Sequence, residues 1–95
     1  YVGGMGSRDK NFYNQLVQRY GVEANAKEVQ DLYLDGNKQE AAAKLPNELI
    51  DEVALCGPPE RIKDRLQAWK DSPVTTLCAS TIQTEVLELL AEECN

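Results

Sequence analysis

Residues that could bind a ligand gather near the start of the chain, in the stretch YVGGMGSRDK. Three glycines precede a predicted helix, and clustered glycines before a helix can present backbone N–H groups to a phosphate. Arg8 and Lys10 would add positive charge. The spacing matches neither G-x-G-x-x-G nor G-x-x-x-x-G-K-[ST], so a structural turn into the helix is the favoured interpretation and an anion or ligand site is the alternative. The candidate ligand-binding residues are Gly6, Ser7, Arg8 and Lys10.

Residue types that usually carry catalysis or bind metals are scarce. The sequence has no histidine, which is the commonest general base and the usual partner of a serine or cysteine nucleophile. Its three cysteines, Cys56, Cys78 and Cys94, lie far apart, so we expect reduced thiols and no zinc site. The glutamates between residues 85 and 93 are best interpreted as a solvated face. We therefore assign no catalytic and no metal-ligating residue.

The overall composition narrows the possible partners. Sixteen acidic residues against ten basic residues give a net charge of −6, which argues against binding to a nucleic acid backbone. No apolar run approaches the roughly 18 residues that a membrane span needs, and no secretion signal is recognised, so we expect a cytoplasmic protein that does not enter membranes. With 95 residues, of which 42% are hydrophobic, residues 1–95 are expected to form a single domain.

Short amphipathic helices must position the candidate residues. Glycines and prolines divide the chain into blocks with helical periodicity, so the predicted fold class is mainly α, with five to six short helices and one strand. Ser7 is the expected N-cap of the first helix, whose apolar stripe is Phe12, Leu16 and Tyr20. The predicted helices cover residues 9–20, 23–35, 38–45, a block from Pro46 to before Gly57, residues 59–71, and a last helix opened by a capping box of Ser80 and Gln83.

The one predicted strand is Val74–Ala79, within the stretch VTTLCAS, and its apolar character predicts burial on both faces. A single strand cannot satisfy its own backbone hydrogen bonds, so it must pair with another chain or with a missing part of its sheet. Because the chain also begins at Tyr1 without a methionine, we expect it to be a piece of a longer protein. Trp69 and Cys78 are expected to be buried.

Two resemblances to known proteins compete. LYLDGNKQEAAAKL is similar to the corner of a tetratricopeptide repeat, although nothing else in the chain repeats at the required period of about 34 residues. YVGGMGSRDKNFYNQLVQRYG, LP-x-ELIDEVAL-x-GPPERI and VTTLCAS together resemble the C-terminal region of luciferase-like flavin- or deazaflavin-dependent oxidoreductases. This second resemblance covers essentially the whole chain in order, and its motifs are the more specific.

The luciferase-like resemblance implies the last quarter of a (β/α)8 barrel. Residues 9–55 would be a helical insertion region, residues 58–95 the helix–strand–helix end of the barrel, and VTTLCAS its eighth strand. The implied reaction is hydride transfer with a reduced flavin or deazaflavin. Most coenzyme contacts in this family come from earlier strands, so the isolated chain is expected to hold no cofactor and to be inactive. Pro73 departs from the expected glycine, and Cys78 and Ala79 are smaller than the usual aliphatic residues.

An alternative function belongs to a different class. Helices shaped to cover a barrel would leave apolar patches in water, and self-association would bury them. The chain would then be a helical interaction module without enzymatic activity, and it would form a homo-oligomer. Pairing of VTTLCAS across a two-fold axis would be antiparallel.

Overall fold

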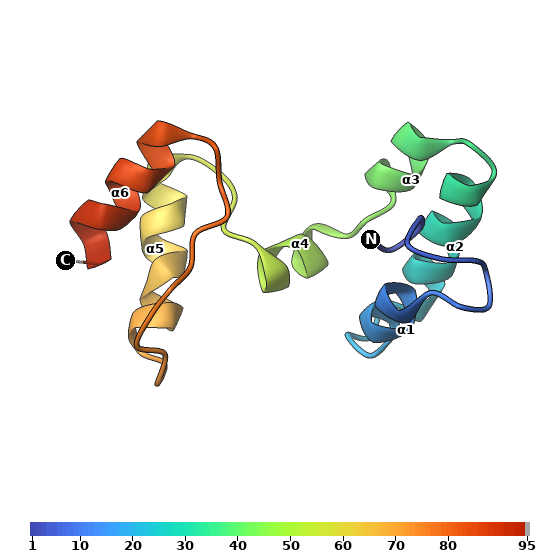
Figure 1. Ribbon diagram of the computed structural model, residues 1–95, viewed down its shortest axis with the longest axis horizontal. Helices are drawn as coiled ribbons and strands as arrows, with labels where there is room; N and C mark the ends of the chain where they lie inside the picture. The colour runs from blue at the N-terminus through green and yellow to red at the C-terminus, as the bar shows by residue number, and fades with distance from the viewer. Residues whose placement is uncertain (95) are drawn as a thin grey trace. The chain divides into compact units, whose positions relative to one another are not determined.

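The computed structural model describes residues 1–94 and confirms that the chain is mainly helical. The described residues form two compact units, one covering Tyr1–Val53 and the other beginning at Ala54. The single-domain assignment and the division into residues 9–55 and 58–95 stay predictions. The six helices, labelled in Figure 1, are α1 (Phe12–Gln18), α2 (Glu23–Leu34), α3 (Lys38–Ala43), α4 (Asn47–Val53), α5 (Pro59–Lys70) and α6 (Thr84–Cys94).

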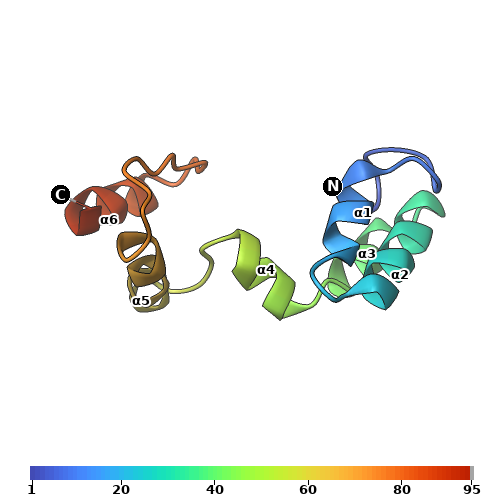
Figure 2. The same cartoon turned by 90° about the horizontal axis from the view of Figure 1, so that it is seen from below.

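In the first unit, α2 is the central element and packs against both α1 and α3 (Figures 1 and 2). Gly21 and Gly36 have φ values of 84° and 91°, which is the left-handed conformation that commonly stops a helix. Each follows the helix that it was predicted to end. Ala26 and Ala41 are both 1% exposed, and such small side chains let helices approach closely. The buried hydrophobic residues of this unit are Ala26, Val29, Ala41 and Leu49.

The first helix differs from its prediction at both the cap and the buried face. The N-cap is Asn11, whose side-chain oxygen accepts from the N–H of Asn14 at 3.0 Å, so the helix begins at Phe12. Ser7 is not the cap, because it lies four residues upstream of Asn11 and its carbonyl accepts from Lys10 in a tight turn. The predicted stripe is also wrong, since Phe12 and Tyr20 are 70% and 50% exposed.

The second unit is built on α5 and α6, which pack against each other. α5 begins at Pro59, as predicted, because proline suits a first helical position. Ile62 and Leu66 are its buried residues, but Trp69 is 43% exposed, so its predicted burial is wrong. The α6 carboxylate of Glu93 lies 3.8 Å from Lys63 Nζ and 3.4 Å from Lys70 Nζ of α5.

The predicted strand is not formed within this chain. Residues 74–80, drawn in orange between α5 and α6 in Figure 1, have neither helical nor strand structure and are exposed. The physical reason is that the described residues supply no neighbouring strand, and an unpaired strand leaves its backbone to water. The predicted burial of Cys78 is wrong for the same reason. The capping box is also absent, because the N–H of Gln83 donates to Thr81 Oγ1 at 3.1 Å rather than to Ser80.

Candidate functional site

Three of the four candidate residues meet in one tight turn. Ser7 and Lys10 form an antiparallel bridge, and the N–H of Lys10 donates to the carbonyl of Ser7 at 3.1 Å. Gly6 lies directly against the backbone of Lys10, where a Cβ atom would overlap the Lys10 carbonyl oxygen. The glycine is therefore required by the close approach of two backbone segments.

Arg8 differs from Lys10 in that its charge is paired within the chain. One nitrogen of its guanidinium pairs with Asp31 and the other lies 3.1 Å from Asp35 Oδ1. These two aspartates are four residues apart on α2 and so share one face of the helix. Because two carboxylates already balance the charge of Arg8, it is a weaker candidate for an anionic ligand. Lys10 is exposed and has no acidic partner among the described residues, which leaves its charge available.

The turn is also anchored to α2 by contacts that sequence reasoning missed. The side-chain amide of Gln30, which is 6% exposed, donates to the carbonyls of Ser7 at 3.4 Å and Arg8 at 3.2 Å. Upstream, Gly3 and Gly4 lie on the side chain of Tyr33, and a Cβ atom at either glycine would overlap it. The adjacent glycines indicate in the sequence that something packs closely on the backbone there. The sequence does not say that the ring of Tyr33 does so.

A buried polar network fixes the start of the chain to α1 and α2. Asn14, which is 3% exposed, donates from Nδ2 to the carbonyls of Val2 at 2.9 Å and Ala26 at 2.7 Å. Its Oδ1 accepts from Gln18 Nε2 at 2.8 Å. Asn11 donates to the carbonyl of Val2 at 3.1 Å while it caps α1. The asparagines of the NFYN motif therefore hold the glycine-rich segment in place.

The described acidic and cysteine side chains form no further candidate metal or disulfide site. Among the described residues, no group of three acidic, histidine or cysteine side chains is arranged to hold a metal ion. Cys56, Cys78 and Cys94 are exposed and unpaired by disulfides. None of the helices in residues 1–94 is both long enough and apolar enough to cross a membrane.

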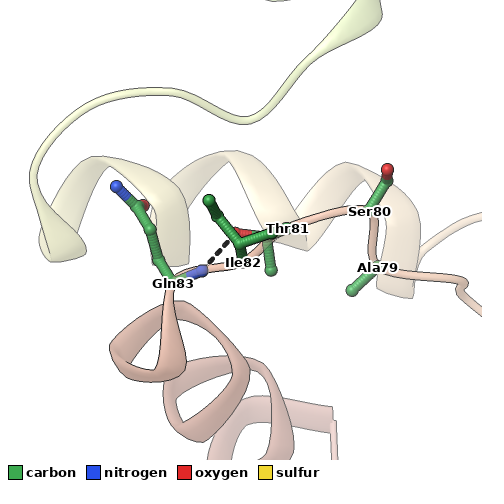
Figure 3. Close-up of a pocket in the computed structure, with 5 residues that line it drawn as sticks. All are labelled: Ala79, Ser80, Thr81, Ile82 and Gln83. Carbon is green, nitrogen blue, oxygen red and sulfur yellow. Dashed lines mark hydrogen bonds between the residues drawn. The ribbon is translucent and has the colours of Figure 1, made fainter.

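An open hollow lies on the loop before α6. It is lined by Ala79, Ser80, Thr81, Ile82 and Gln83, and Figure 3 shows these side chains along one stretch of backbone. A flavin or deazaflavin ring needs a concave pocket that buries most of its surface. Five consecutive residues of one exposed loop provide no opposing wall, and Ile82 is fully exposed. These five residues therefore do not fit such a ring by themselves.

Comparison with known proteins places the chain in a family. A family model described as "Luciferase-like monooxygenase" matches residues 1–76. A protein of Mycobacterium tuberculosis (strain ATCC 25618 / H37Rv), named "Putative coenzyme F420-dependent oxidoreductase", is 31% identical over 91 residues. These residues are 96% of this chain and 26% of the relative, so the chain spans about a quarter of the relative's length. No solved structure matches the chain significantly. The chain, with its glycine-rich turn and NFYN network, therefore belongs to the luciferase-like monooxygenase family.

Proposed function

We propose that this chain acts as the C-terminal part of a luciferase-like oxidoreductase that transfers hydride with a reduced deazaflavin or flavin. The observation that carries the proposal is the exposed segment of residues 74–80. Its β-branched and apolar residues suit a buried strand, yet they lie in water without a partner. The missing partner strands would come from the rest of a barrel. The relative is named as dependent on coenzyme F420, which favours a deazaflavin over a flavin.

The isolated chain is proposed to be inactive. Its hollow at residues 79–83 is formed by one stretch of loop, and the candidate turn in the first unit offers the single ammonium of Lys10. A binding site for a cofactor needs several convergent polar groups around a largely apolar pocket. The rest of the barrel would supply that pocket, and the turn at Gly6, Ser7, Arg8 and Lys10 would contribute contacts to an anionic ligand. A cytoplasmic location also stays a prediction.

A chimera tests the proposed function. The C-terminal quarter of the Mycobacterium tuberculosis relative is replaced by residues 1–95 of this chain, and binding of coenzyme F420 is measured by fluorescence. We expect the chimera to bind, and the truncated relative and the isolated chain not to bind. The relative with its own C-terminal quarter is the positive control. A folded chimera without binding, or tight binding by the isolated chain, would overturn the proposal.

Self-association is the second candidate function. Exposed apolar side chains in both units favour it, with Phe12, Trp69 and Leu87 exposed by 70%, 43% and 46%. Burial of such side chains between copies would stabilise an oligomer without any enzymatic activity. Sedimentation of the purified chain distinguishes this function: an oligomer that neither joins a barrel nor supports F420 binding would favour it.

A further inference from the structure

α1 packs with the opposite polarity to most surface helices. Its one buried residue is the polar Asn14, which is 3% exposed, and Val17 and Gln18 are half-buried. Its apolar side faces outward, with Phe12 70%, Tyr13 39% and Leu16 37% exposed. A surface helix of an independent globular protein normally turns its apolar stripe toward the core. The outward stripe therefore points to a surface that something else covers.

Most of the outward side chains are spaced three or four residues apart along α1 and just beyond it, and we call this set, together with Tyr1, the aromatic face. The rings of Tyr1 and Tyr13 meet edge to face at 4.9 Å between centroids, and those of Phe12 and Tyr13 at 5.8 Å. Tyr1 and Tyr20 are 78% and 50% exposed. Such ring contacts hold the aromatic side chains in a defined arrangement before any partner arrives. The aromatic face consists of Tyr1, Phe12, Tyr13, Leu16 and Tyr20.

The size and charge of this face argue against a second copy as its occupant. With the exposed fractions above, its four aromatic side chains offer roughly 350–600 Å². A stable interface needs about 800 Å² from each partner, so pairing of the face with its own counterpart across a two-fold axis falls short of a stable dimer. Each copy also carries a net charge of −6, which adds repulsion between copies.

We infer that the aromatic face docks on the apolar surface of the part of a luciferase-like polypeptide that precedes this region. This inference rests on the proposed function and names the surface through which it operates. The chain covers only 26% of the length of its relative, and the counterpart of the remaining three quarters of that protein is the proposed occupant. That partner would also contact other exposed apolar residues, such as those at 74–82, which supplies the area that the face lacks.

Separate polypeptides test the aromatic face. The Mycobacterium tuberculosis relative without its C-terminal quarter is the probe, and its affinity for this chain is measured by calorimetry. Phe12→Glu places a charge on the face at the first position of α1, where an acidic residue favours the helix. Gln15→Glu makes the same charge change on the same helix but off the face, and it serves as the matched control. Tyr20→Glu, just beyond α1, is the second test variant.

The expected result is a loss of at least tenfold in affinity for Phe12→Glu and Tyr20→Glu, with Gln15→Glu binding like the unmodified chain. Far-UV circular dichroism of each variant should match the unmodified chain, because the altered side chains are exposed. If all three variants bind like the unmodified chain, the aromatic face is not the docking surface, while the proposed function stands. If the unmodified chain does not bind, both fail. A dimer in sedimentation that Phe12→Glu dissociates would assign the face to a second copy instead.

Discussion

At the scale of single residues, the N-terminal glycines matter for the space that they leave free. Gly3 and Gly4 make room for the side chain of Tyr33, and Gly6 makes room for the carbonyl of Lys10. This requirement explains three glycines in six residues without a phosphate. Lys10 stays a candidate ligand contact, because the close approach at Gly6 also fixes the backbone position of Lys10.

Replacing Gly6 with alanine should destabilise the first unit strongly. The new Cβ would overlap backbone, which cannot move aside as a flexible side chain can. We expect a loss of about 2–3 kcal/mol in the free energy of unfolding. Gly21→Ala is the comparison, because Gly21 has open space around it and only its φ of 84° is unfavourable, which costs about 1 kcal/mol. Urea unfolding followed by circular dichroism measures both, and equal losses would contradict the steric explanation.

Asn14→Asp tests the buried polar network. The substitution keeps the shape of the side chain but replaces its amide donors with a carboxylate that faces the carbonyls of Val2 and Ala26. A buried charge against two acceptors should cost about 3 kcal/mol or more. Asn47→Asp is the control, since Asn47 is exposed in the first turn of α4, where a negative charge is favourable. Thermal unfolding should separate the two variants; similar stability would show that the network contributes little.

At the scale of elements, the sequence predicted where helices occur better than which side they bury. Pro59 and Gly36 act through their own backbone geometry, so their positions alone predict a helix start and a helix end. The buried side of α1 depends on partners elsewhere in the chain. Asn14 is buried where it donates to the carbonyls of Val2 and Ala26, and no periodicity in the helix reveals these contacts. The Arg8 pair with Asp31 and Asp35 depends in the same way on a contact between distant segments.

The two units should differ in local stability. α2 contributes Ala26, Val29 and Gln30 to the buried interior of the first unit, whereas none of the described side chains of α6 is buried. Helices with few buried contacts open locally at low free energy. We expect the amides of α6 to exchange with solvent at least 100-fold faster than those in the middle of α2. Hydrogen exchange with mass spectrometry tests this, and equal protection of the two helices would contradict it.

At the scale of the whole molecule, the sequence predicted a strand that this chain cannot complete. The local preference of VTTLCAS for extended structure is real, but strand structure requires hydrogen bonds that only a neighbouring strand can supply. Helices close their backbone hydrogen bonds within themselves, which is why all six could be anticipated from local sequence. The candidate site shows the same limit: its turn was recognisable, but its contacts with Gln30 and Tyr33 of α2 were not, because they join segments that are distant in the sequence.

Residues 74–79 should acquire strand protection when the remainder of a barrel is supplied. In the isolated chain this segment is exposed and unpaired, so its amides should exchange at nearly unprotected rates. In the F420-binding chimera, pairing on both sides should slow their exchange at least 100-fold. α3 serves as the internal control, because its backbone hydrogen bonds already exist within the helix in the isolated chain. The exchange of its amides should therefore change little. A chimera that folds and binds coenzyme while residues 74–79 stay unprotected would show that this segment is not a barrel strand.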